Sequence, residues 1–207
     1  MSLELEVPGL YFTPEIITEY EEEKILNYLE NDKGRPIMQI HPAHEYGWKF
    51  LNRENGYNGV LTVNDYLGGI PEWLKSIWYN CIDRSDFPMK TNIVPDHVLI
   101  NRYEIGDGCR AHVDDINFWT DWVVGLSLGS GCTIVFSYSQ RKIPIYVPAR
   151  SVYVLTGEAR YNYTHEINQQ TEDLVGTKMI KRNKRTSITF REISEKFLSK
   201  DVRRKTT

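Results

Sequence analysis

The chain has 207 residues, 41% of them apolar and 26% charged, with a formal net charge of −3 at pH 7. This size and composition fit one globular domain that buries a core, and they exclude two large domains. No apolar run approaches the roughly 20 residues that a membrane-spanning helix needs, and the three cysteines show no C-x-x-C spacing. We therefore expect a soluble protein of the nucleus or cytoplasm, monomeric, with no membrane segment, disulfide framework or thiolate zinc site.

Two helices are predicted before the strands begin. Thr18 and Glu21 form the pattern of a capping box, and the apolar residues that follow share one face, which predicts a helix over about 19–31. A second helix is predicted over about 71–82, because Pro71 suits a first turn and apolar residues recur in pairs every four residues. We expect both helices to cover a sheet.

From Val98 onward the pattern changes to short β-branched and aromatic runs, separated by Gly, Pro and Asn. Helices first and many short strands afterwards predict an α+β fold: a double-stranded β-helix (jelly roll) with N-terminal covering helices. The predicted strands are 97–103, 122–128, 132–137, 143–147, 151–155, 160–165 and 185–193.

Candidate metal ligands lie among the five histidines. His112 and Asp114 are two residues apart, and in a strand such side chains point to the same face. His165 is far enough along the chain to come from another strand and to supply a third ligand. Two histidines and one carboxylate form the facial triad of non-haem Fe(II) oxygenases, which leaves positions for a chelating 2-oxo acid and dioxygen. The alternative is ordinary strand packing. The remaining histidines, His41, His44 and His97, are expected to be satisfied or exposed.

The run from Arg185 to Arg191 has an arginine at each end of a strand that alternates polar and apolar residues. Six residues is an even offset, so both guanidinium groups face one side, with Cα atoms about 20 Å apart. A small dicarboxylate fits between two such side chains, because arginine pairs with carboxylates through two parallel hydrogen bonds. Asn101 and Tyr103 share one face of an earlier strand and suit the same acid. The alternatives are surface arginines and plain strand packing.

The end of the chain is basic. Residues 178–207 carry 11 Lys and Arg against 3 Asp and Glu, whereas residues 1–177 carry 14 against 25. Such a segment suits phosphates or an acidic partner, and it also fits a solvated surface. The run 181–185 has the composition of a nuclear localisation signal.

Several short motifs between residues 95 and 193 follow one another in a particular order. They are Asn101-x-Tyr103, Gly106-x-Gly108, His112-x-Asp114, residues 125–130, residues 148–151, residues 155–157 with Arg160, His165, and Arg185-x5-Arg191. In this order they resemble the AlkB family of Fe(II)/2-oxoglutarate dioxygenases. The resemblance implies a single domain over 1–207, with helices and a substrate lid at 1–94, a jelly-roll catalytic core at 95–193 and a basic tail at 194–207.

The resemblance also implies Fe(II), the co-substrate 2-oxoglutarate and O2, with the iron held by the triad described above. Arg185 and Tyr103 would bind the distal carboxylate of 2-oxoglutarate, and Arg191 and Asn101 its other end. Because Arg185 then has a buried role, the run 181–185 is a poor nuclear signal. The implied co-substrate residues are Asn101, Tyr103, Arg185, Ser187 and Arg191.

Departures from the family pattern bear on the substrate. Repair-type members carry an acidic residue two positions after the metal aspartate, whereas this chain has Ile116 there, which argues against alkylated-base repair. The motifs around Asp115 and residues 148–151 most resemble the branch of AlkB homologue 4, for which protein methyl-lysine and DNA N6-methyladenine substrates are discussed. Residues 46–50 resemble the tRNA-modifying branch nearly as well. The candidate substrate contacts are Tyr46, Trp48, Asp115 and Trp119, with simple packing at a barrel rim as the alternative for the aromatics.

The implied reaction converts 2-oxoglutarate to succinate and CO₂ and hydroxylates a nearby C–H bond, and a hydroxylated N-methyl group then leaves as formaldehyde. Three interpretations follow. The first is oxidative demethylation or hydroxylation of alkyl groups on nucleic acid. The second is the same chemistry on a methylated basic protein, such as a histone or a cytoskeletal protein. The third is a non-catalytic module that binds nucleic acid or histones.

Overall fold

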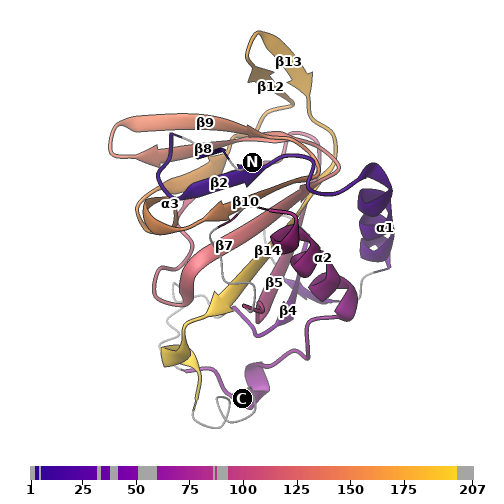
Figure 1. The fold of residues 1–207 in the computed structure, drawn as a ribbon, viewed down its shortest axis with the longest axis vertical. Coiled ribbons are helices and arrows are strands. Elements are labelled where there is room, and N and C mark those ends of the chain that lie inside the picture. Colours follow the sequence, from indigo (N-terminus) through magenta and orange to yellow (C-terminus); the bar gives the residue numbers. More distant parts are fainter. Residues whose placement is uncertain are drawn as a thin grey trace.

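Two antiparallel sheets face each other in the computed structural model, which describes residues 3–4, 6–31, 34–37, 42–50, 60–85, 87 and 93–199 (Figure 1). The predicted α+β jelly roll is confirmed. The large sheet has the strand order β1-β2-β10-β7-β14-β5-β4-β3, and the small sheet has the order β6-β11-β8-β9. The strands of the large sheet are β1 Leu3–Glu4, β2 Leu10–Thr13, β3 Arg35–Ile37, β4 Ala43–Gly47, β5 His97–Tyr103, β7 Trp119–Leu128, β10 Ser151–Leu155 and β14 Arg185–Ile193. Those of the small sheet are β6 Cys109–His112, β8 Cys132–Tyr138, β9 Arg141–Val147 and β11 Thr164–Ile167.

Two helices lie on the outer side of the large sheet, as predicted (Figure 1). Helix α1 is Glu19–Glu30, and its capping box forms: Glu21 N–H donates to Thr18 Oγ1 at 3.2 Å, and Thr18 N–H donates to the Glu21 carboxylate at 2.8 Å. Helix α2 is Glu72–Asp83, one residue later at each end than predicted. Within the described residues, no helix has both the length and the apolar character that crossing a membrane requires.

Strand alternation gives the large sheet two different faces. On β14, Ile188 and Phe190 are buried in the main core beneath the helices, where Phe190 packs against Trp78 of α2 at 5.4 Å between ring centroids. Neighbouring residues of the same strand, Ser187 and Thr189, line the space between the sheets. One strand therefore serves the core with one set of side chains and the interior of the barrel with the other.

The predicted strand over 160–165 is wrong in its first half. Residues Gly157–Tyr161 form the short helix α3, and β11 begins only at Thr164. In this helix Arg160 is buried and donates to the backbone carbonyl of Thr120 at 3.2 Å, as well as to two further carbonyls described below. These contacts with a distant part of the chain favour the helical turn, and residues 160–165 alone do not reveal them.

A third, two-stranded sheet projects beyond the barrel at the top of Figure 1. It consists of β12 Glu172–Val175 and β13 Lys178–Lys181. At its base the buried Asp173 and Arg182 form an ion pair with an Nε–Oδ2 distance of 2.6 Å. The basic segment predicted from sequence therefore does not form one exposed surface, because Arg182 and Arg185 are both buried. Residues 200–207 lie outside the described residues.

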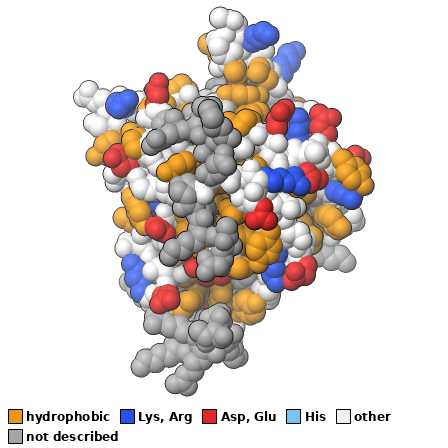
Figure 2. Space-filling view, viewed as in Figure 1, with side chains coloured by type: hydrophobic (Ala, Val, Ile, Leu, Met, Phe, Trp, Pro, Cys, Tyr) orange, Lys and Arg blue, Asp and Glu red, His pale blue; other side chains and the backbone are white. Residues whose placement is uncertain are grey.

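Charges of both signs are mixed on the exterior. On the face shown in Figure 2, Lys and Arg side chains lie among Asp and Glu side chains. Helix α1 illustrates this: Arg84 forms a salt bridge to Glu21 at 2.7 Å, and Arg150 forms one to Glu22 at 3.2 Å. The excess negative charge of residues 1–177 is partly compensated by the basic segment, through Arg182–Asp173, Lys184–Glu104 and Arg191–Asp114.

Candidate active site

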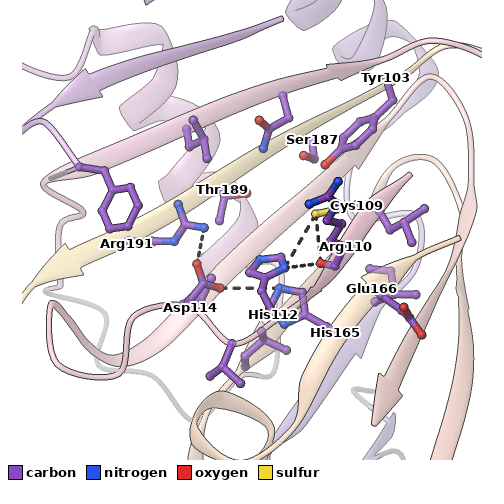
Figure 3. A pocket seen from close by; sticks show the side chains of 18 of the residues that line it. Tyr103, Cys109, Arg110, His112, Asp114, His165, Glu166, Ser187, Thr189 and Arg191 are labelled. Carbon is purple, nitrogen blue, oxygen red and sulfur yellow. Dashed lines mark hydrogen bonds and ion pairs between the residues drawn. The ribbon is translucent and has the colours of Figure 1, made fainter. Parts of the chain in front are cut away.

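Three side chains with metal-binding atoms converge between the two sheets (Figure 3). His112 ends β6, His165 lies opposite it on β11, and Asp114 follows β6 by two residues. One ligand atom of each lies within 4.8 Å of the ligand atoms of the other two. Two imidazoles and one carboxylate are the donor set of a facial-triad Fe(II) site. The structure thus brings together the three residues that the sequence analysis selected.

Asp114 reaches the site from a loop and not, as expected, from the strand that carries His112. The loop is held by Arg160, which donates to the backbone carbonyls of Asp114 at 2.8 Å and Asp115 at 2.9 Å. Within the loop, Asp115 Oδ1 accepts the backbone N–H of Asn117 at 2.8 Å. The guanidinium group of Arg160 and this turn aim the Asp114 carboxylate at the two histidines.

Two of the three triad side chains, Asp114 and His165, have the protonation state that a divalent cation requires. Burial by itself would raise the pKa of Asp114, but the charge of Arg191 and the adjacent imidazoles outweigh it and hold that pKa well below its usual range. Burial lowers the pKa of His165 to about 4, and its Nδ1 has no hydrogen-bond partner within the described residues. His112 Nδ1 lies 2.8 Å from the carbonyl oxygen of Arg110, which assigns the proton to Nδ1 and leaves Nε2 available. A metal ion requires an ionised carboxylate and neutral imidazoles. His112 differs from the other two: burial lowers its pKa, but Cys109 and the charge of Asp114 outweigh burial and raise that pKa to about 9, so a metal ion would have to displace a proton from this imidazole.

A cavity of about 860 Å³ lies beside the triad, between the large and the small sheet. One wall is formed by β14 and β5, where the cross-strand pairs Arg185–Tyr103 and Ser187–Asn101 both line it. Arg185 Nε donates to Ser127 Oγ at 2.9 Å, and its guanidinium carbon lies 5.3 Å from the centre of the Tyr103 ring. The buried Nη2 of Arg185 has no partner within the described residues. A buried guanidinium with an open donor fits a carboxylate.

The sequence profile described as the 2OG-Fe(II) oxygenase superfamily matches residues 15–191. The chain belongs to this superfamily. Its cofactors are accordingly Fe(II), 2-oxoglutarate and O2, and the two parts of the site described above fit the first two: a triad of open donors and a buried arginine facing a cavity.

Relatives place this oxygenase in the AlkB family. It is 32% identical over 217 residues to mouse (Mus musculus) ALKBH8, named tRNA (carboxymethyluridine(34)-5-O)-methyltransferase; the match covers 93% of this chain and 32% of that protein. It is 33% identical over 89 residues to bovine (Bos taurus) mitochondrial alkB homolog 7, covering 42% and 40% of the two chains. The solved structure of OsALKBH1 shares the fold, with a TM-score of 0.67, 15% identity and coverage of 93% and 100%. The chain thus spans about a third of the length of the mouse relative.

The branch assignment made from sequence is not supported. The relatives above carry the names of homologues 8 and 7, and none of them is named homologue 4. The motifs at residues 148–151 and around Asp115 shape turns here: Arg150 has a positive φ of 62°, and Asp115 accepts backbone N–H groups in the metal loop. Both motifs therefore have a structural role in this chain.

In this oxygenase the bound Fe(II), 2-oxoglutarate and O2 supply the oxidation of a substrate C–H bond, coupled to the decarboxylation of 2-oxoglutarate. The triad would hold the iron, and Arg185 with Tyr103 would bind a carboxylate of 2-oxoglutarate. Arg191 has a different task from Arg185. Its Nη2 lies 2.5 Å from Asp114 Oδ1, and its guanidinium carbon lies 5.3 Å from the centre of the Trp119 ring, so Arg191 orients the metal-binding carboxylate. Its buried Nε has no partner within the described residues. This N–H group would be available to the other end of 2-oxoglutarate, as the sequence analysis expected.

Two aromatic residues predicted to contact substrate do not line the cavity. Tyr46 lies opposite Val98 in the β4–β5 pair and packs against the main core, on the other face of the sheet. Trp48 is buried in a separate cluster, with its ring centroid 4.7 Å from that of Tyr66. The structure thus places both side chains away from this cavity, because the aromatic type of a residue does not reveal which face of a strand it occupies.

Trp119 and Asp115 line the cavity, but neither is open to a substrate in the way the sequence suggested. Trp119 is only 2% exposed, since its ring is packed against His97 and Phe118, each at 4.6 Å between ring centroids. The Asp115 carboxylate accepts backbone N–H groups of Asn117 and Phe118 within the metal loop. Phe50, by contrast, is 37% exposed and lies 5.3 Å from the Trp119 ring.

The sequence analysis missed part of the cavity wall. Arg35, Glu45, Phe50 and His97 all line it, and three of them come from the segment that was treated as a lid without predicted strands. The available signal for strand β4 was an alternation of side chains, with Ala43, Glu45 and Gly47 on one face and His44 and Tyr46 on the other. It is weak, because Ala and Gly do not indicate burial by type.

The buried neighbours Asp96 and His97 make opposite contributions to pH-dependent stability. Burial raises the pKa of Asp96 to about 7 and lowers that of His97 to about 4. As pH falls from 7 to 5, folded Asp96 takes up a proton before the unfolded chain does, which stabilises the fold, whereas His97 is protonated only in the unfolded chain, which destabilises it. Each effect amounts to about 2 kcal/mol over this interval.

Single variants separate the two contributions. In Asp96→Asn the free energy of unfolding should fall on acidification from pH 7 to 5, and in His97→Gln it should rise. Urea denaturation at both pH values measures this. Parallel pH profiles for the two variants would contradict the assignment.

Proposed function

We propose that this oxygenase oxidises an alkyl group on nucleic acid, with tRNA as the first candidate. The observation that carries the proposal is the match over 93% of the chain to mouse ALKBH8, a protein named for a modification of carboxymethyluridine in tRNA. The macaque (Macaca fascicularis) protein of the same name matches over 91% of the chain. The described site supports catalysis, since the triad and the buried Arg185 are both present. A non-catalytic module would not need either.

The oxidation has two possible products. A hydroxyl group on a carbon-linked substituent is retained, whereas a hydroxylated N-methyl group is lost as formaldehyde. Ile116 is 49% exposed and offers no hydrogen-bond acceptor for a cationic methylated base. We therefore propose stable hydroxylation of a side group in preference to demethylation of a purine.

Methylated basic protein is the second candidate substrate. Residues 1–177 carry an excess of acidic side chains, which would attract a basic peptide such as a histone tail. The excess is partly compensated by cations of the C-terminal segment, as in Arg182–Asp173 and Lys184–Glu104. It is not concentrated at the cavity, whose lining holds as many arginines as acidic residues.

A turnover assay with parallel substrates tests the proposal. Purified protein with Fe(II), 2-oxoglutarate and ascorbate is incubated with tRNA, with a methylated DNA oligonucleotide and with a trimethyl-lysine peptide. Mass spectrometry of the digested products should show a 16-Da gain in a tRNA nucleoside that is missing with His112→Ala. Turnover of the peptide alone would contradict a nucleic-acid substrate.

Truncating the basic C-terminal residues offers a second test, and the structure limits how many residues can be removed. Phe197 is buried, and Leu61 and Leu198 form a β-bridge, so a truncation before residue 199 would damage the fold. Deleting residues 200–207 removes four basic and one acidic side chain. If this segment contacts phosphates, the deletion should weaken tRNA binding. It should also reduce the slope of the logarithm of the tRNA association constant against the logarithm of salt concentration by up to about 3. An unchanged slope in a filter-binding titration would show that the segment is solvated surface.

A further inference from the structure

The outer edge of the large sheet forms part of the cavity wall. Residues directly opposite each other in antiparallel strands point to the same face. The register pairs Arg35 with Glu45, Glu45 with Leu99, and Leu99 with Thr189. Arg35 and Glu45 therefore extend, to the sheet edge, a row that begins at Thr189 on β14. Thr189 itself lies close to Arg191 and the triad (Figure 3).

Glu45 is a buried carboxylate at this edge. Its side chain is 2% exposed, it forms an ion pair with the Arg35 guanidinium, and its Oε2 accepts the backbone N–H of Phe50 at 3.2 Å. His97 Nε2 lies 3.6 Å from the same oxygen. A buried carboxylate is costly unless it is paired and hydrogen-bonded, so Glu45 is stable there only while both partners stay in place. Conversely, Glu45 fixes the positions of Arg35 and Phe50.

The two partners of Glu45 present their outer parts to the cavity. The Arg35 side chain is 45% exposed, and within the described residues it donates to Glu45 alone. The Phe50 ring is supported from behind by Trp119 at 5.3 Å and by Phe118 at 5.7 Å, while the residue remains 37% exposed. One cation whose only acceptor among the described residues is Glu45, and one aromatic ring packed against Trp119 and Phe118, thus lie on the same side of the cavity.

We propose that Arg35 and Phe50, positioned by Glu45, form the substrate subsite for an uncharged or anionic planar base that presents carbonyl or carboxylate oxygens. This inference rests on the proposed function and names its substrate class. Arginine only donates hydrogen bonds, so it selects oxygen acceptors, and its charge repels a cationic base or a methylammonium group. A methylammonium also needs several open aromatic faces, whereas Trp119 is closed off by its neighbours.

The charge of residue 35 should set substrate selectivity. The probes are two RNA hairpins that differ at one nucleotide, either anionic 5-carboxymethyluridine or cationic 1-methyladenosine, and kcat/KM is measured for each by mass spectrometry of the nucleosides. Wild-type protein should prefer the uridine. Arg35→Glu should shift the ratio of the two kcat/KM values toward the adenosine by about tenfold to a hundredfold. Lys24→Ala, which removes an exposed cation on α1, should leave the ratio unchanged. Because the readout is a ratio, general damage to folding cancels.

Glu45 is tested as a positioning residue. Glu45→Gln keeps the size of the side chain but weakens its hold on Arg35 and Phe50, so KM for the uridine hairpin should rise about tenfold with a smaller change in kcat. If Glu45 acts through Arg35, the double variant Arg35→Ala/Glu45→Gln should be little worse than Arg35→Ala. Phe50→Ala should also raise KM for the uridine hairpin, whereas Phe50→Tyr, which keeps the aromatic ring, should leave it near the wild-type value.

Two negative results are distinguishable. Turnover of RNA with the same selectivity ratio in wild type and Arg35→Glu would overturn the subsite alone. Turnover of a trimethyl-lysine peptide and of neither hairpin would overturn the proposed function and the subsite together.

Discussion

Replacing His112 with alanine is expected to abolish 2-oxoglutarate turnover while the protein stays folded. The variant removes one of three ligands that lie within 4.8 Å of each other, and it leaves the Asp114–Arg191 ion pair intact, so no buried charge loses its partner. Turnover is followed as succinate formation, and folding as the melting temperature. Adding Mn²⁺ should raise the melting temperature of the wild type, because a ligand that binds only the folded state stabilises it, and should raise that of the variant much less.

Asp114→Ala should be equally inactive but less stable. It removes the partner of the buried Arg191 guanidinium, and an unpaired buried charge costs about 3–5 kcal/mol. Comparison of the two variants therefore separates the loss of the metal from the loss of the ion pair. Full turnover by either protein would show that the triad does not bind the catalytic iron.

Replacing Arg185 with alanine is expected to weaken 2-oxoglutarate binding by about 2–5 kcal/mol, since a carboxylate would be left in the cavity without its charged partner. This corresponds to a loss of affinity of roughly 30-fold to several thousand-fold. Anaerobic calorimetry with the metal-loaded protein measures it.

The neighbouring Lys184 provides a matched control. Its side chain is 74% exposed and pairs with Glu104 on the surface, so Lys184→Ala removes the same charge one residue away without touching the cavity. Its affinity for 2-oxoglutarate should equal that of the wild type. Unchanged affinity in Arg185→Ala would mean that the co-substrate is held elsewhere.

Local patterns predicted much of the fold. Strands His97–Tyr103, Ser151–Leu155 and Arg185–Ile193 have the predicted bounds, because β-branched and aromatic runs end there at turn residues. The Thr18–Glu21 capping box starts α1 where expected. Helix α3 was missed because Arg160 stabilises it through carbonyl groups about 40 residues earlier in the chain, a contact that no short window contains.

The candidate site was predictable in one part and not in the other. Histidine is rare in this chain, so His112, Asp114 and His165 stood out by type and order. Arg185 and Arg191 stood out because an even spacing in a strand places both on one face. The face of Tyr46, by contrast, depends on how β4 pairs with β5, and that register is set by contacts between segments about 50 residues apart.

The two faces of β14 have a consequence for mutational scanning. Substitutions at Ile188 and Phe190 should lower the amount of folded protein in cells, because these side chains fill the core. Substitutions at Arg185 or Ser187 should leave abundance closer to normal and remove activity. The effects of substitutions on abundance and on activity should therefore alternate along this strand with a period of two, in opposite phase. A single-residue deletion within the strand would turn core-facing side chains toward the cavity and cavity-facing side chains toward the core, and would abolish both abundance and activity.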